Sequence, residues 1–151
     1  MGKLIAEAML DRIRSQGNTI AFQHGGGIRA SFSAGKVIMG DVLAALPFQN
    51  TIATFLLQRS DIRAAWENGV SPRESRAGRF PQLAGLTFSF LPAAQVGNRR
   101  KDIIVQTADG SFAPLEADKV CRVVSNNNLR AHGDGYAVFR YKARNFCDFG
   151  P

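Results

Sequence analysis

The sequence contains few histidines and cysteines, the residues that most often build a catalytic or metal centre. Among its 151 residues there are only two histidines, two cysteines and one tryptophan. Two cysteines are too few for a disulfide framework or a cysteine-based metal site. Cys121 and Cys147 would pair only in an exported protein. The sequence favours no such bond, because Cys121 falls in a predicted strand and Cys147 in the C-terminal tail.

The two histidines do not make a metal site either. His24 and His132 each lie beside a glycine turn, and Asp134 is close to His132 in the sequence. A hydrolytic metal centre needs more histidine and carboxylate ligands at compact spacing. The sequence also lacks a Gly-x-Ser-x-Gly motif and a Cys/His nucleophile arrangement. We therefore predict binding chemistry without a catalytic centre or a cofactor in this chain.

The sequence also lacks long apolar runs and an excess of acidic residues. No apolar run approaches the roughly 20 residues that span a bilayer. The sequence does not begin with basic residues followed by an apolar segment, so we predict no signal peptide in these residues. We expect a single domain over 1–151, long enough to bury a real core. The net charge of +7 favours anionic partners. Nucleic-acid polymers are not predicted, because no helix-turn-helix, zinc pattern or paired aromatic motif is present.

Residue spacing predicts helices interleaved with strands. Helices are expected over 2–16 with Gly17 as the stop, from an Asp41 cap to Ala45, and from a Ser60 cap to Asn68-Gly69 with Trp66 in the core. Strands are expected over 20–22, 51–58, 86–91, 103–106 and 120–124, with a hairpin turn at Asp109-Gly110 and a strand or short helix over 136–141. Segments 71–80 and 125–128 read as polar loops, and 145–151 has no clear pattern. The order favours an α+β or mixed α/β domain with a mixed sheet.

The stretch 19–50 carries most of the functional signal. Three glycines, Gly25, Gly26 and Gly27, let the chain turn with positive φ and let another molecule approach the bare backbone. Consecutive N–H groups of such a turn can bind an anion, and Arg29 adds a planar set of donors for phosphate or carboxylate. Phe48 follows a turn made by Pro47. Each feature alone is also compatible with a plain turn, a solvated arginine and a core phenylalanine.

The order of these motifs resembles the C-terminal domain of 5'-nucleotidases, a family that includes UDP-sugar hydrolases and 2',3'-cyclic nucleotide phosphodiesterases. The motifs that carry the resemblance are Met1–Met9, His24-Gly25-Gly26-Gly27-Ile28-Arg29, Leu46-Pro47-Phe48-Gln49-Asn50, Gly78–Leu86 and His132-Gly133-Asp134-Gly135-Tyr136. They appear in the family's order over nearly the whole length. The resemblance implies layered helices and mixed β-sheets of that domain type.

The resemblance also implies a division of labour. In this family a separate N-terminal domain, outside these 151 residues, carries a pair of divalent metal ions and the phosphoric monoester hydrolase activity. The C-terminal domain binds the nucleotide or nucleoside and presents it to those metals. The chain by itself is therefore expected to be inactive, and its partners are a nucleotide or nucleoside and its own N-terminal domain. The family implies a periplasmic, secreted or cell-surface location.

Three residues match family positions that bind the substrate. Arg29 matches an arginine that binds near the phosphate or ribose, beside the glycine turn of Gly25–Gly27. Phe48 matches an aromatic that stacks on the base, and Asp134 matches a carboxylate that accepts hydrogen bonds from ribose hydroxyls. We expect these residues to share one binding site.

Three further positions of this site depart from the family pattern. His24 replaces an asparagine that binds the base, Asn128 replaces the second stacking aromatic, and His132 replaces the first glycine of the Gly-Gly-Asp-Gly loop. An amide stacks poorly, so nucleobase binding is expected to weaken or change, while the His132 ring could supply a substitute. Two alternatives therefore stay open: a drifted, non-catalytic module that binds another anion or a protein, and a domain of a thiosulfate-ester or cyclic-nucleotide hydrolase.

Overall fold

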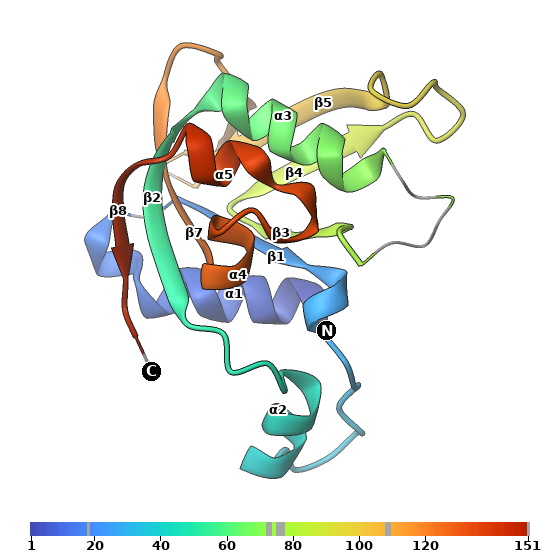
Figure 1. The fold of residues 1–151 in the computed structure, drawn as a ribbon, viewed down its shortest axis with the longest axis vertical. Coiled ribbons are helices and arrows are strands. Elements are labelled where there is room, and N and C mark those ends of the chain that lie inside the picture. The colour runs from blue at the N-terminus through green and yellow to red at the C-terminus, as the bar shows by residue number, and fades with distance from the viewer. Residues whose placement is uncertain (18, 72–73, 75–77, 108–109, 151) are drawn as a thin grey trace.

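The computed structural model describes residues 1–17, 19–71, 74, 78–107 and 110–150 (Figure 1). In chain order its elements are α1 (Gly2–Arg12), η1 (Arg14–Gln16), β1 (Ile20–His24), η2 (Gly25–Gly27), α2 (Met39–Ala45), β2 (Ile52–Gln58), α3 (Arg59–Val70), β3 (Pro81–Ala84), β4 (Leu86–Phe90), β5 (Arg100–Gln106), β6 (Phe112–Pro114), β7 (Val120–Asn126), α4 (Asn127–Arg130), η4 (Gly133–Gly135), α5 (Ala137–Tyr141) and β8 (Arg144–Asp148). The predicted mixed α+β fold is confirmed.

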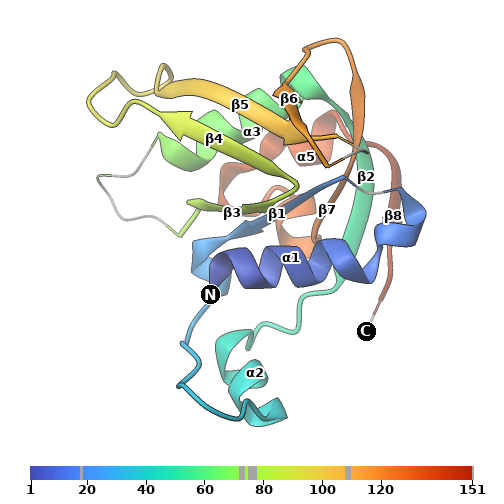
Figure 2. The same cartoon turned by 180° about the vertical axis from the view of Figure 1, so that it is seen from behind.

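Two sheets organise the fold. A five-stranded sheet has the order β3-β1-β7-β2-β8, and a three-stranded sheet has the order β4-β5-β6. In the larger sheet β1 and β7 run parallel and the other pairs are antiparallel. Helix α1 covers one face of this sheet, and α3, α4 and α5 lie on the other face (Figures 1 and 2). The sheet is therefore mixed, as predicted.

Alternation along the central strands divides the core into two clusters. Ala21 of β1 and Val124 of β7 pack with Ala6 and Ile13 on the α1 side. Their neighbours along the strands, including Phe22, face the larger cluster beneath α3 and α5. Both faces of β1 are buried, since successive side chains of a strand point to opposite faces.

The larger cluster is aromatic. The Phe22 and Phe139 rings meet edge to face with centroids 5.3 Å apart, and Tyr136 stacks on Phe139 at 5.2 Å. Trp66 belongs to the same cluster and is 1% exposed, which confirms its predicted place in the core. A buried aromatic contributes about 1.5–3 kcal/mol relative to an exposed one, so this cluster holds the helical layer on the sheet.

Strand direction brings four connecting segments to one edge of the larger sheet. Because β1 and β7 are parallel, the segments that follow both strands leave from the same edge. The antiparallel partners begin there too, since Ile52 of β2 pairs with Asn126 and Pro81 of β3 pairs with His24. Residues far apart in the chain therefore meet at this edge.

Three strands were not predicted. Strand β8 forms an edge beside β2, and every residue in it is exposed. Strands β3 and β6 have four and three residues, too short for a clear alternation. The predicted polar loop at 125–128 is also wrong, because β7 runs to Asn126 and α4 begins at Asn127. The predicted Asp109-Gly110 turn lies partly outside the described residues; β5 and β6 on either side of it do pair antiparallel.

Two predicted helix caps are wrong. Helix α2 begins at Met39, and the Asp41 carboxylate instead accepts a hydrogen bond from the Ile38 N–H at 2.9 Å. Ser60 lies inside the first turn of α3 rather than before it, and that helix continues past Asn68-Gly69 to Val70. Segment α2 projects from the body of the domain (Figures 1 and 2), and Met39 is 71% exposed on it.

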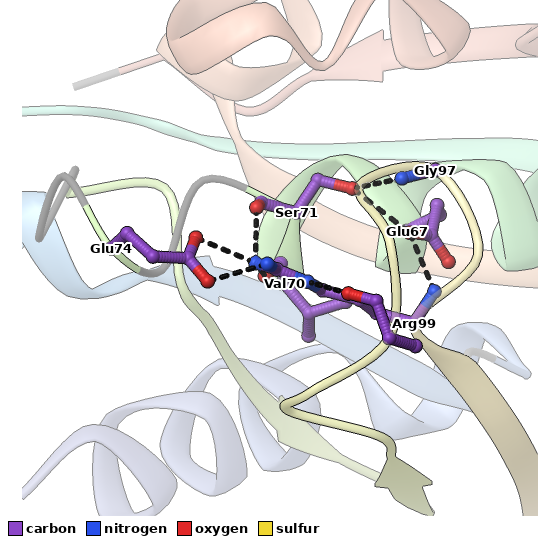
Figure 3. Close-up of polar contacts among 7 residues, drawn as sticks. Glu67, Val70, Ser71, Glu74, Gly97 and Arg99 are labelled. Atoms are coloured by element: carbon purple, nitrogen blue, oxygen red, sulfur yellow. Dashed lines mark hydrogen bonds and ion pairs between the residues drawn. The ribbon is translucent and has the colours of Figure 1, made fainter.

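A buried arginine ties the end of α3 to the β4–β5 connection (Figure 3). The Arg99 side chain pairs with Glu74 and donates to the Val70 carbonyl, while the Glu67 carboxylate accepts the Arg99 N–H at 3.1 Å. Burial alone would raise the pKa of Glu67, but the N–H groups of Arg99 and Arg100 and the Ser71 hydroxyl hold this pKa below its usual value. The network therefore joins the end of α3 to the residues at the start of β5.

Candidate functional site

The glycine turn after β1 allows close backbone packing. Gly25–Gly27 form the 3₁₀ turn η2, and none of the three has a positive φ. The Gly25 N–H donates to the Phe80 carbonyl at 2.9 Å and the Gly26 N–H to the Gly78 carbonyl at 2.6 Å. The predicted positive φ is therefore wrong, and these two N–H groups are not available for an anion.

The absence of a side chain at these positions still matters. A Cβ on Gly26 would lie 2.9 Å from the Gly78 Cα, and a Cβ on Gly27 would lie 2.8 Å from the His24 Cε1. Real Cβ atoms do not approach other atoms this closely, so a side chain at Gly26 or Gly27 would displace the Gly78 backbone or the His24 ring. The turn thus brings the segment after β1 against the segment before β3.

Arg29 is held by its backbone and leaves most of its guanidinium open. Its N–H donates to the Ala45 carbonyl at 2.9 Å, and its Nη1 lies 3.3 Å from the Gly26 carbonyl oxygen. Among the described residues no carboxylate lies within ion-pair distance of Arg29. An exposed guanidinium without a carboxylate partner can bind an incoming anion.

Phe48 lies on the connection between α2 and β2. Helix α2 ends at Ala45 with Leu46 as its C-cap, and Pro47 follows Leu46, where it cannot extend the helix. The Phe48 side chain is 57% exposed rather than buried in the core. A large aromatic ring that is half open to solvent at a cleft is available for stacking.

The segment after β7 carries Asn128 and Asp134. The Asn126 Oδ1 accepts the Leu129 N–H at 2.8 Å and so caps α4, which leaves Asn128 exposed in the first turn. Asp134 has a φ of 53°, an uncommon conformation for a residue with a side chain. The Asn68 side chain supports it, since its Nδ2 donates to the Asp134 carbonyl at 3.2 Å.

His132 has a backbone conformation that is unusual for a residue with a side chain. Its φ of 75° lies in the left-handed region that glycine adopts freely. Its ring stacks on Tyr141 with centroids 6.4 Å apart. His132 does not line the cleft described below, so its ring does not replace the missing aromatic there.

His24 lies between Asn126 and Asp134. Its Nε2 is 3.6 Å from the Asp134 Oδ2, and its Nδ1 is 3.4 Å from the Asn126 Nδ2. Burial lowers the pKa of His24 below its usual 6.5, and the Asp134 carboxylate opposes that effect in part. The imidazole is therefore neutral at pH 7. Because Asn126 presents a donor to Nδ1, the proton is assigned to Nε2, facing Asp134.

These segments enclose one open cleft of about 520 Å³. It is lined by His24, Gly26, Arg29, Phe48, Asn50, Gly78, Asn128 and Asp134. The structure thus brings six of the predicted site residues together. Gly25, Gly27 and His132 do not line it. Asn50 and Gly78 were missed as site residues, although both belong to family motifs. The sequence carries no direct signal for Asn68 and Asn126, which hold Asp134 and His24.

The cleft does not have the ligands for a metal centre. His24 and Asp134 supply two donor groups, and across the described residues no group of three or more His, Cys, Asp or Glu side chains could hold a metal ion. Cys121 and Cys147 are both free, on strands separated by β2. No helix in the described part of the chain is long and apolar enough to cross a membrane.

Comparison with known proteins identifies the family of this fold and cleft. Residues 1–141 match the family model described as "5'-nucleotidase, C-terminal domain". The chain therefore belongs to the C-terminal domain family of the 5'-nucleotidases, which are phosphoesterases.

Three similar proteins illustrate the relationship. The chain is 36% identical over 140 residues to the trifunctional nucleotide phosphoesterase protein YfkN of Bacillus subtilis (strain 168), covering 92% of this chain and 10% of that protein. The crystal structure of a 5'-nucleotidase precursor from Thermus thermophilus matches 99% of this chain with a TM-score of 0.94 and 41% identity. The Haemophilus influenzae NAD nucleotidase (NadN) matches 97% of this chain and 27% of its own with a TM-score of 0.87 and 24% identity, which shows the fold alone. The chain spans only 29% of the Thermus protein, so the similar proteins are much longer.

Proposed function

We propose that this chain is the substrate-binding domain of a 5'-nucleotidase-like phosphoesterase. The observation that carries the proposal is the shared cleft: Arg29, Phe48 and Asp134 come from three segments far apart in the sequence and line the same hollow. Family membership supports the same conclusion. The ligand is a nucleotide or a nucleoside.

Each of the three residues has a role that its chemistry and exposure support. Arg29 binds phosphate or ribose oxygens with a guanidinium that has no carboxylate partner among the described residues. The half-exposed Phe48 ring stacks on the base, and the Asp134 carboxylate accepts hydrogen bonds from the ribose hydroxyls. The net charge of +7 attracts the anionic ligand.

His24 has a different role from the asparagine that it replaces. Its two ring nitrogens already face Asn126 and Asp134, and the residue is 5% exposed. We therefore assign His24 to orienting Asp134 rather than to recognising the base. A base held on Phe48 would meet the Asn128 amide on its other side instead of a second ring.

Bond cleavage takes place outside this chain in this proposal. The longer relatives and the lack of a three-ligand metal cluster among the described residues support a separate catalytic domain that holds the metal pair. The domain described here presents the nucleotide to it. Because the family resemblance implies a role in nucleotide breakdown outside the cytoplasm, we place the whole protein in the periplasm, at the cell surface or in the medium.

An NMR titration of this chain with AMP, UMP and adenosine tests the binding role. We expect backbone shifts at Gly26, Arg29, Phe48 and Asp134 at ligand concentrations up to the millimolar range, and tighter binding of AMP than of adenosine because Arg29 contacts the phosphate. Arg29→Gln should remove that difference. The control Arg14→Gln, which removes only a surface pair with Asp11, should not. An absence of shifts at these residues with all three ligands would refute the proposal.

A second candidate is a drifted module that keeps the fold but no longer binds nucleobases. Asn128 in place of a stacking aromatic favours it. Asn128→Phe distinguishes the two: a weakened nucleobase site should gain affinity for adenosine, whereas a site for another anion or for a protein should not. His24→Asn serves as a companion variant, since it restores the other polar group of the family pattern.

A further inference from the structure

A second hollow of about 220 Å³ adjoins the cleft and shares Phe48 and Asn50 with it. Its walls come from α1, from the α2–β2 connection and from the start of β2. The apolar side chains among them are Ile5, Met9, Leu46, Phe48 and Ile52. None of its lining residues is charged. Of the residues that line this hollow, only Phe48 has a role in the nucleotide site proposed above.

Two buried amides, Gln23 and Asn126, are among the polar residues that line this hollow, and one backbone N–H determines how both are oriented. The Leu129 N–H can only donate, so the Asn126 atom that meets it at 2.8 Å is the oxygen Oδ1. The Asn126 Nδ2 then faces Gln23, and the Gln23 atom 2.6 Å away has to be the acceptor Oε1. The Gln23 Nε2 is therefore the end of the amide that is left over.

The Gln23 Nε2 has no acceptor within the described parts of the chain, although Gln23 is only 4% exposed. A Cβ on Gly27 would lie 2.8 Å from this nitrogen, and both residues line the hollow. The bare backbone at Gly27 thus leaves the donor open to the hollow. This nitrogen is not one of the fully buried side-chain atoms that lack a partner in the described part of the chain, so it reaches the hollow and can donate to a ligand carbonyl there.

We propose that this hollow is a second binding subsite for a flat, uncharged ring that carries a carbonyl group. The uncharged lining excludes ionised groups, and the apolar walls favour a ring. Its volume exceeds the ~150 Å³ of an apolar cavity that accepts benzene, so a substituted six-membered ring has room. The carbonyl oxygen accepts from the Gln23 Nε2. The subsite does not depend on which ligand occupies the neighbouring cleft.

Three small probes test the proposal on the unaltered chain by NMR of its methyl groups. Benzamide has the ring and the carbonyl, toluene has the ring alone, and cyclohexanecarboxamide has the carbonyl without a flat ring. We expect benzamide to shift the Ile5 and Met9 methyl signals and to bind about threefold to tenfold more tightly than toluene, the range of one net hydrogen bond. Cyclohexanecarboxamide should also bind more weakly than benzamide, because its ring is not flat. Equal binding of all three, or no shift at Ile5 and Met9, would overturn the proposal.

Variants test the same site from the protein side. Met9→Phe fills the hollow and should abolish the benzamide shifts, whereas Leu43→Phe, at a position 56% exposed on α2, should leave them unchanged. Gln23→Glu keeps an acceptor for Asn126 but removes the donor, so benzamide should lose its advantage over toluene. Survival of the Ile5 shifts in Met9→Phe, or of the benzamide preference in a folded Gln23→Glu variant, would refute the subsite.

An AMP titration separates this proposal from the nucleotide-binding role. If AMP shifts Arg29 and Asp134 while benzamide leaves Ile5 and Met9 unchanged, the second subsite is refuted and the nucleotide site stands. If benzamide shifts Ile5 and Met9 while AMP shifts neither Arg29 nor Asp134, the subsite stands and the nucleotide-binding role is refuted.

Discussion

Gly26 and Gly78 lie in direct backbone contact at the cleft. The Gly26 N–H donates to the Gly78 carbonyl at 2.6 Å, and a Cβ on either glycine would come within 2.9 Å or 2.7 Å of the Cα of the other. Since both residues line the cleft, this contact sets the distance between the segment after β1 and the segment before β3.

Gly78→Ala should therefore destabilise the domain by about 1–3 kcal/mol, because the added methyl group forces two backbone segments apart. Urea unfolding measures the change. Gly40→Ala on α2 is the matched control, since its Cβ would meet only the Ile38 Cδ1 at 3.8 Å, and alanine favours a helix. An unchanged free energy of unfolding in Gly78→Ala would contradict the contact.

Phe48→Ala should weaken adenosine binding by about 1–3 kcal/mol, the usual contribution of one aromatic ring stacked on a base. Isothermal titration provides the affinity. Phe112→Ala removes a ring that is 53% exposed on β6 and does not line the cleft, so it should bind adenosine like the unaltered chain. Equal losses in both variants would show that the effect is not stacking.

His24 should make folding less favourable in mildly acidic solution. Burial lowers its pKa in the folded chain below 6.5, so the unfolded chain takes up the proton at pH values where the folded chain does not. The free energy of unfolding should therefore fall as pH drops below about 6.5, by at most about 1.4 kcal/mol per pH unit, until the folded-state pKa is reached.

Urea unfolding between about pH 8 and about pH 5 measures this slope above the range where carboxylates titrate. His24→Asn should lose the part of the slope that His24 contributes, and His132→Asn should keep it. A slope that is the same in the unaltered chain and in His24→Asn would show that His24 is not buried as described.

His132→Gly should stabilise the domain by up to about 1 kcal/mol. The φ of 75° at His132 is strained for a residue with a Cβ, and glycine removes that strain, although it raises the entropy of the unfolded chain. Thermal unfolding detects the gain. His132→Ala loses the same ring contact with Tyr141 but keeps the strain, so it should not be more stable than the unaltered chain.

Glu67→Gln should destabilise the domain by about 1–3 kcal/mol, because the amide replaces a carboxylate that accepts from the Arg99 N–H, the Arg100 N–H and the Ser71 hydroxyl. Chemical unfolding at neutral pH gives the difference. Glu116→Gln, which removes only the surface pair with Lys119, is the control and should unfold like the unaltered chain. A loss of the same size in Glu116→Gln would point to net charge as the cause.

The sequence predicted the fold class because the helices and central strands have clear periodicity. Segment α1 shows helical spacing, and β2 is an apolar, β-branched run. Strand β8 could not be predicted, since its exposed residues have no alternation and its pairing with β2 is set by the rest of the sheet. The family resemblance named six of the residues that line the cleft, but not how they meet.

The glycine turn shows why local patterns were not enough at the site. Three consecutive glycines indicate a special backbone, and the sequence favoured positive φ for them. The structure uses them for close approach instead, and the reason is Gly78, a residue far along the chain. The same holds for His24, whose partners Asn126 and Asp134 can be recognised only when β1 and β7 lie side by side.

The parallel pair β1 and β7 has a consequence for how this domain can change. The segments that follow these strands carry Arg29, Asn128 and Asp134, while the strands themselves carry the core. We therefore expect that replacing the two segments after β1 and β7 with those of a relative changes the ligand preference of the proposed site. The hydrophobic core should not need to change.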